Sequence, residues 1–325
     1  MLNKLLAIAL ILVLQGCGRD TTDTPKPQTK VLIGILDVRF KAGAEKFRDA
    51  FAKRLGTIQR AIPEQNISFV IEYPPFEGDM AAAARRLVAK SPDILIAIND
   101  DAALALAAVT KSIPVVFQSY DDPVAKGIVP SLTAPKFNLT GYNFYRRTHL
   151  KRWEILLQVA PGTKKIGVLL DPKYVPTGIL EDMQRAKTGL GLHVVPLYLS
   201  QGEPIASLES KLSTAQIDAL DLPHYGHFTM KQKKTVAEIT KLKRPTSYDG
   251  NLYCSWGGTV CFARENTPTE NLAADYVKLI LNGALPSEIP VSSPAKYELS
   301  INMTTIKSLG LRPPHSITSV ARIYE

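Results

Sequence analysis

Short apolar runs alternate with amphipathic stretches along most of this chain. The clearest case is Pro92 to Val129, which reads as a strand, a helix, a second strand and the start of another helix. Ile94 to Ile98 is an unbroken apolar run between polar residues, as is typical of a strand buried on both faces of a parallel sheet. Asn99, Asp100 and Asp101 follow it and supply N-cap chemistry for the alanine-rich helix.

The same alternation extends in both directions, and it restarts after Gly141-Tyr142-Asn143. It predicts two α/β lobes with parallel, doubly wound sheets. The predicted strands are Val31 to Leu36, Ile67 to Tyr73, Ile113 to Phe117, Lys165 to Leu170, His193 to Leu199, Ile217 to Leu222 and a short one ending near Tyr248. The predicted helices include one with a Phe47, Phe51 and Leu55 stripe, then Met80 to Ala89, His149 to Val159, Gly178 to Lys187 and Ile205 to Leu212.

Two neighbouring predicted strands end in polar loops, Asn99 to Asp101 and Ser119 to Asp122. In open α/β sheets, ligands bind in the crevice beyond the carboxyl ends of the strands. Structural capping explains the same residues without a ligand, since acidic caps and an Asp-Pro turn occur in many α/β proteins. The loops are therefore candidates for one wall of a binding site.

The N-terminus has the pattern of an export signal. Lys4 precedes an apolar run from Leu5 to Leu14, which is too short to span a bilayer because a spanning helix needs about 20 residues. The Leu-Gln-Gly-Cys sequence that ends at Cys17 resembles the lipobox of bacterial lipoproteins. We expect residues 1–16 to be a signal peptide, Cys17 to be lipidated, and residues 17–30 to form a flexible tether. Gly18 would permit an outer-membrane location.

Composition agrees with a soluble globular part outside the cytoplasm. The chain has 325 residues, 45% of them hydrophobic, and a formal charge of +9. Its densest basic stretch carries Val236, Ile239 and Leu242 at helical spacing, so we interpret it as a solvated helix face and expect no nucleic-acid partner. Cys254 and Cys261 could form a disulfide or remain two thiols, and an oxidising compartment favours the disulfide.

Motifs of common enzyme classes are absent from the sequence. There is no nucleophile elbow, P-loop, zinc-protease helix or dinucleotide fingerprint. His224 and His227 are three residues apart, but no third ligand has a matching spacing, so we predict neither a metal site nor a cofactor.

Five segments together resemble the family of ABC-transporter substrate-binding proteins that includes tryptophan- and tyrosine-binding lipoproteins. They are PDILIAI, IPVVFQSYDDPVAKGIV, NLTGYN, KKIGVLLDP and ILNGALPSEIPV. The resemblance implies a type I periplasmic binding fold, with two lobes joined by three crossovers. It places residues 31–143 and 264–292 in the first lobe, and residues 144–263 and 293–325 in the second.

The resemblance also implies that strand-end loops of both lobes face a ligand cleft. Helix N-terminal N–H groups could bind a carboxylate, an aspartate could pair with an ammonium group, and tyrosines could stack on a flat ring. For each tyrosine, packing at the cleft rim is the alternative. The predicted ligand-binding residues are Asp37, Asn99, Asp100, Asp101, Ser119, Tyr120, Asp122, Tyr142, Asn143, Pro172, Tyr174, His224, Tyr225, Tyr248 and Asp249.

The implied function is capture of a small polar or aromatic, amino-acid-like molecule for an ABC importer, by a lipoprotein of the cell envelope that is not an enzyme. The implied partners are the ligand, a transporter permease and the membrane that holds the lipid anchor, and we expect a monomer. Two alternatives stay open from the sequence: a lipoprotein that signals ligand binding to a membrane receptor, and an enzyme on the same fold.

Overall fold

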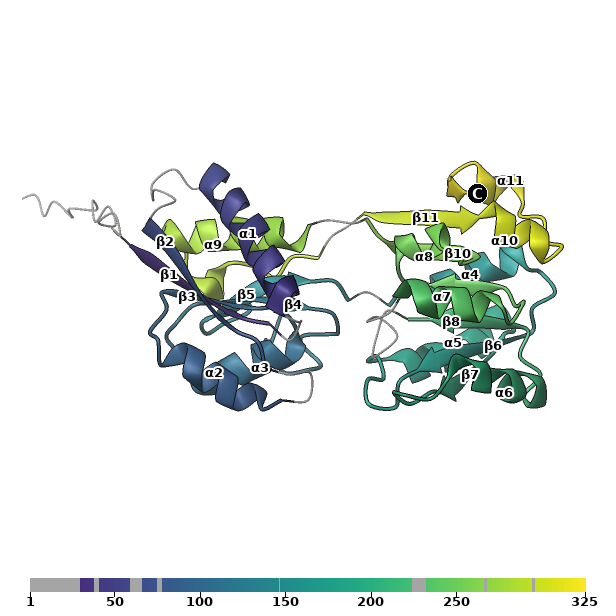
Figure 1. Ribbon diagram of the computed structural model, residues 1–325, viewed down its shortest axis with the longest axis horizontal. Helices are drawn as coiled ribbons and strands as arrows, with labels where there is room; N and C mark the ends of the chain where they lie inside the picture. The colour runs from purple at the N-terminus through teal and green to yellow at the C-terminus, as the bar shows by residue number, and fades with distance from the viewer. Residues whose placement is uncertain are drawn as a thin grey trace, which may run out of the picture.

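The computed structural model describes residues 30–37, 41–58, 66–74, 78–145, 147–223, 232–265, 268–293 and 296–325. These residues form two α/β lobes that lie side by side and are joined by narrow connections (Figure 1). One lobe is built on a five-stranded sheet and the other on a seven-stranded sheet. The predicted fold class, two doubly wound lobes, is confirmed.

The first lobe has the strand order β2-β1-β3-β4-β5, with every pair parallel. Helices α1 and α9 cover one face of this sheet, and α2 and α3 cover the other (Figure 1). The strands are β1 (Val31–Leu36), β2 (Ile67–Glu72), β3 (Ile94–Ala97), β4 (Val115–Ser119) and β5 (Leu139–Asn143). The helices are α1 (Lys41–Ile58), α2 (Met80–Val88), α3 (Asp100–Val109) and α9 (Thr269–Leu281).

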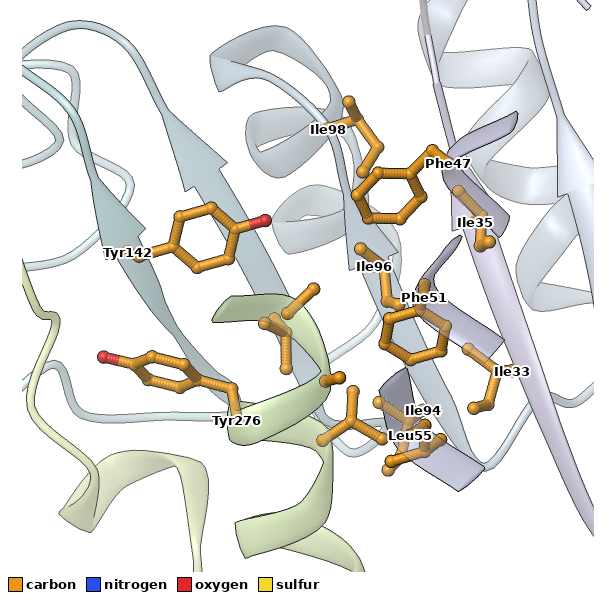
Figure 2. Close-up of a cluster of buried hydrophobic side chains, with 14 of the residues drawn as sticks. Ile33, Ile35, Phe47, Phe51, Leu55, Ile94, Ile96, Ile98, Tyr142 and Tyr276 are labelled. Atoms are coloured by element: carbon orange, nitrogen blue, oxygen red, sulfur yellow. The ribbon is translucent and has the colours of Figure 1, made fainter. Parts of the chain in front are cut away.

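Spacing along α1 explains how it packs on the sheet. Phe47, Phe51 and Leu55 recur every four residues, so they share one face of the helix, and all three are buried against Ile33 and Ile35 of β1 (Figure 2). Full burial of each such side chain contributes about 1.5–3 kcal/mol. The strand it covers is apolar at nearly every position because helices lie on both faces of the sheet.

The second lobe has the strand order β12-β11-β10-β9-β8-β6-β7. Its pairs are parallel except β10 with β11, an antiparallel pair that departs from the predicted all-parallel sheet. The strands are β6 (Lys165–Leu170), β7 (His193–Tyr198), β8 (Ala219–Leu222), β9 (Thr246–Tyr248), β10 (Val260–Arg264), β11 (Tyr297–Asn302) and β12 (Arg322–Tyr324). The helices are α4 (His149–Val159), α5 (Ile179–Leu190), η2 (Ile205–Ser207), α6 (Leu208–Thr214), α7 (Gln232–Thr240), α8 (Asn251–Ser255), α10 (Met303–Ser308) and α11 (His315–Thr318).

The chain passes between the two lobes three times (Figure 1). The first passage joins β5 to α4, and the second joins β10 to α9. The third follows η4 (Pro286–Glu288) and a bridge between Ser292 and Tyr142, and it leads into β11. Three segments that are distant in sequence therefore meet between the lobes.

The predicted helix start in Asp121 to Val129 is wrong. Oδ1 of Asp122 accepts hydrogen bonds from the backbone N–H groups of Val124 and Ala125, as at a helix start. The segment nevertheless forms only turns, because Gly127 takes a φ of 73°, which ends the helical path.

No helix in the described parts of the chain has the length and apolar character needed to span a membrane.

Candidate functional site

A cavity of about 270 Å³ lies where the three passages between the lobes meet. The first lobe contributes Tyr120, from the loop after β4. The remaining wall comes from the passages and from the second lobe. It includes Phe144 and Tyr145 of the first passage, Arg264 at the end of β10, Tyr297 at the start of β11, and the segment Asp249, Gly250, Asn251, Leu252 and Tyr253.

Arg264 is a cation of this cavity that forms no ion pair with any described residue. Its guanidinium carbon lies 3.6 Å from the ring centroid of Phe144, in cation–π geometry. Its Nη1 atom is buried. Among the residues that the structure describes, this atom has no hydrogen-bond partner and no carboxylate lies within ion-pair distance of the side chain. Burial lowers the pKa of Arg264, because desolvation disfavours the charged form.

Asp249 supplies a carboxylate to the same cavity. Its Oδ2 atom lies 3.6 Å from Nη1 of Arg152, and its side chain stays 27% exposed. Arg152 is already neutralised, since Nε and Nη2 donate to Asp221 at 3.0 and 2.9 Å and both partners are fully buried. Nη1 of Arg152 also donates to the Thr148 hydroxyl at 2.8 Å. Asp249 therefore keeps capacity to pair with a group in the cavity.

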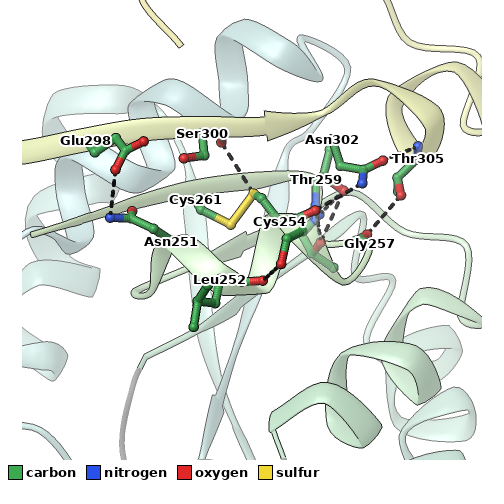
Figure 3. Close-up of a disulfide and its surroundings, with 12 residues drawn as sticks. Asn251, Leu252, Cys254, Gly257, Thr259, Cys261, Glu298, Ser300, Asn302 and Thr305 are labelled. Atoms are coloured by element: carbon green, nitrogen blue, oxygen red, sulfur yellow. Dashed lines mark hydrogen bonds between the residues drawn. A yellow bond between two sulfur atoms is a disulfide. The ribbon is translucent and has the colours of Figure 1, made fainter. Parts of the chain in front are cut away.

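Helix α8 forms one wall and is attached to the sheet by several bonds (Figure 3). The structure contains the Cys254–Cys261 disulfide, which joins α8 to β10. Nδ2 of Asn251 donates to the backbone carbonyl of Arg264 at 3.0 Å, and Nδ2 of Asn302 donates to the carbonyl of Cys254 at 3.0 Å. Helix α8 and Arg264 are therefore both fixed to strand β10.

The lobes also touch beside the cavity. The Thr177 hydroxyl and backbone N–H, in the second lobe, donate to the carboxylate of Asp121 in the first lobe at 3.0 and 3.3 Å. The Tyr145 hydroxyl, from the first passage, donates to the carbonyl of Thr177. Burial and, next to it, the charge of Asp121 raise the pKa of Tyr145 to about 12. Tyr145 therefore stays a neutral donor at physiological pH.

Two of the predicted ligand-binding residues, Tyr120 and Asp249, line the cavity. The other first-lobe predictions do not line it, and most of them bond to neighbouring first-lobe residues. Asn99 caps α3 through a 2.8 Å bond from the N–H of Ala102. Asp100 accepts from the Ser119 hydroxyl and from the N–H of Tyr120 at 3.1 Å. Of the rest in this lobe, Asp37 is buried beside β2, Asp101 is exposed on α3, and Asp122 caps its own turn.

The hinge and second-lobe predictions fall into two groups. Tyr142 is fully buried in the first lobe and donates from its hydroxyl to Gln118 at 3.1 Å (Figure 2). Oδ1 of Asn143 accepts from the N–H of Tyr145. Tyr248 is fully buried and stacks on Tyr253 at 5.0 Å, so it supports the wall from behind. Pro172 is exposed and Tyr174 is half-buried in the loop after β6, whereas Cys17, His224 and Tyr225 lie outside the described residues.

The lining residues that sequence reasoning missed include Arg264, Phe144, Tyr145, Asn251, Tyr253 and Tyr297. Phe144, Tyr145, Arg264 and Tyr297 lie in or next to the passages between the lobes, whereas Asn251 and Tyr253 belong to α8. A sequence signal existed for part of this set, because NFY directly follows the NLTGY segment that marks the first passage. Arg264 had no local signal, since its environment arises from contacts with Phe144, which is distant in sequence.

In the described residues, no group of three or more His, Cys, Asp or Glu side chains could hold a metal ion.

Comparison with known proteins decides the family. Residues 75–323, most of the chain, match the family described as ABC transporter substrate binding protein. The chain belongs to this family. A curated relative, the tyrosine-binding protein of Clostridioides difficile strain R20291, is 27% identical over 298 residues, which are 90% of this chain and 83% of the relative.

Solved structures agree on the fold. A conserved domain protein from Vibrio cholerae O1 biovar eltor superposes with a TM-score of 0.75 at 22% identity, covering 92% of this chain and 100% of that one. A Streptococcus pneumoniae ABC domain in complex with L-Trp gives a TM-score of 0.74 at 23% identity, with coverage of 91% and 100%. The ligand-free, open form of a Clostridium difficile substrate-binding protein with adhesive properties gives 0.67 at 22% identity, with coverage of 91% and 99%.

Proposed function

We propose that this chain is an extracytoplasmic solute-binding lipoprotein of an ABC import system and captures an amino-acid-like molecule between its two lobes. One observation carries the proposal: a cavity built by both lobes and their connections holds a cation, a carboxylate and several aromatic rings. Family membership supports the role in transport. The relatives described as binding tyrosine or L-Trp support an amino acid as the ligand.

The chemistry of the cavity suits an aromatic amino acid. A guanidinium binds a carboxylate through paired, charge-assisted hydrogen bonds. Rings such as Tyr120, Tyr253 and Tyr297 offer apolar area with polar edges, which suits a flat side chain that carries a hydroxyl or an N–H group. The described residues that line the cavity act here only as binding groups, so the proposal includes no enzymatic step.

The proposal includes the location and the partners. The apolar run before Cys17 supports export and lipidation of that cysteine, which would anchor the protein at the cell envelope. The permease of the importer is the proposed membrane partner, and the protein would deliver its ligand as a monomer.

A thermal-shift screen of the soluble protein, starting after Cys17, tests the function. The screen covers the twenty amino acids, nucleosides, sugars and small organic acids. A ligand that binds only the folded state stabilises it by about 2.7 kcal/mol at a hundredfold excess over its Kd. We expect aromatic amino acids to raise the Tm most. A shift with sugars or nucleosides and none with any amino acid would contradict the proposal.

A further inference from the structure

We propose that Arg264 binds the carboxylate of an α-amino acid ligand while Asp249 accepts its ammonium group, so that the cavity selects zwitterions. This inference rests on the proposed function and deepens it, because it names the ligand class and the two residues that recognise it. The sequence predicted Asp249 as a ligand contact, whereas Arg264 was not among the predicted residues.

The environment of the Arg264 guanidinium suits the binding of an anion. Taking a charged group out of water costs several kcal/mol unless it is paired and hydrogen-bonded. Arg264 has part of this compensation from the face of Phe144 at 3.6 Å, but no described residue supplies an acceptor to its buried Nη1. Since the side chain lines the cavity, an anion there is the missing partner.

The two described first-lobe loops that the sequence singled out, Asn99 to Asp101 and Ser119 to Asp122, use several backbone and hydroxyl donors internally. The N–H of Tyr120 and the Ser119 hydroxyl already donate to Asp100. The N–H of Ala102, in the first turn of α3, already donates to Asn99. The backbone donors that suggested anion binding at this sheet edge are therefore occupied by the protein's own side chains.

Asp249 completes the pattern. No ion pair joins Asp249 to Arg264, so the two charges stay more than 4.0 Å apart, with the cavity that both residues line beside them. Asp249 lies 3.6 Å from Arg152, but Asp221 already neutralises that arginine. The charges of the two arginines, Arg264 and Arg152, and of the two aspartates, Asp249 and Asp221, sum to zero. A zwitterion keeps this balance, whereas an amine or an acid alone leaves one charge of the cavity without its partner.

Calorimetric titration with matched ligands tests the inference on the wild-type soluble protein. The probes are L-tyrosine and L-tryptophan, the amines tyramine and tryptamine, and the corresponding acids that lack the amino group. We expect each amine and each acid to bind about 10- to 100-fold more weakly than its amino acid, because each loses one charge-assisted interaction. Tyramine that binds as tightly as L-tyrosine would overturn the assignment.

The variant Arg264→Gln tests whether Arg264 is the residue that binds the ligand carboxylate, which the amines lack. We expect the variant to lose about 10- to 100-fold affinity for the amino acid while its affinity for the amine stays nearly unchanged. Arg264→Lys should recover part of the loss, since it keeps the charge without the planar fork. Asp249→Asn should lower the affinity for the amino acid and leave the affinity for the carboxylic acid nearly unchanged. The exposed Arg85→Gln is the matched control and should bind like wild type.

The outcomes separate the two proposals. If L-tyrosine or L-tryptophan binds and Arg264→Gln, with an unchanged Tm, binds it equally well, this inference is wrong while the proposed function stands. If no amino acid binds the wild-type protein, both are wrong.

Discussion

At the scale of single residues, a fully buried ion pair contacts two residues that line the cavity, Asp249 and Thr148. Arg152 on α4 and Asp221 on β8 are both fully buried, and the hydroxyl of Ser247 also donates to Asp221, at 2.6 Å. Although burial by itself raises the pKa of Asp221, the charge and hydrogen bonds of Arg152 bring it below the ordinary 3.8. Removing the arginine would leave a buried carboxylate without its partner.

We predict that Arg152→Met destabilises the protein by about 3–5 kcal/mol at pH 7, as measured by urea unfolding. Lys151→Met is the matched control, because this neighbouring side chain is 52% exposed, and it should change stability by less than about 0.5 kcal/mol. Equal effects of the two substitutions would contradict the role of the pair.

The contribution of this pair also depends on pH. The folded-state pKa of Asp221 lies below the unfolded value, so the pair stabilises the protein above about pH 4. That stability is lost as the pH falls further, through the folded pKa. We expect the stability difference between wild type and Arg152→Met to shrink below about pH 4.

Sequence reasoning at this scale succeeded where chemistry is local. Asn99 caps α3 as its position before the helix predicted, because an N-cap depends only on the following turn. The role of Arg264 could not be predicted, since its burial and its contact with Phe144 arise only when two passages between the lobes meet. The other predicted ligand contacts stay predictions.

At the scale of elements, α8 is too short to be stable alone. Helices this short are unstable in water without tertiary contacts, and this one has five residues. The Cys254–Cys261 disulfide and the Asn302 side chain hold it against the sheet (Figure 3). Because α8 carries part of the cavity wall, its attachment links stability to binding.

We predict that Cys254→Ala with Cys261→Ala lowers the free energy of unfolding by about 2–3 kcal/mol and weakens ligand binding, since the disulfide closes a short loop beside the cavity. Urea unfolding and calorimetry measure the two effects. A reducing agent should lower the free energy of unfolding and the ligand affinity of the wild type, and it should change neither quantity in the double variant. Two alkylatable thiols in the denatured, unreduced wild type would contradict the prediction.

Most elements followed from hydrophobic periodicity, and those that did not have physical reasons. The strands β1 and β6 and the helix α4 have the predicted bounds, because long apolar runs and stripes report burial directly. β5 was missed because its sequence LTGYN has no apolar run, although neighbouring strands bury it. β12, with three residues, is too short for a periodic signal.

At the scale of the whole molecule, the position of the cavity requires the lobes to act together. Its walls come from Tyr120 of the first lobe, from the first passage, and from the second lobe, including the ends of β10 and β11 next to the other two passages. The Asp121–Thr177 hydrogen bonds show that the lobes already touch beside it. A ligand that contacts both lobes favours a closed arrangement by the contacts that it gains there.

Small-angle X-ray scattering of the soluble protein, with and without the amino acid that gives the largest thermal shift, tests this central claim most directly. We predict a smaller radius of gyration for wild type at a ligand concentration just sufficient to saturate it, and a smaller change for Arg264→Gln at the same concentration. A wild-type radius that stays unchanged while calorimetry shows saturation would contradict capture of the ligand between the lobes.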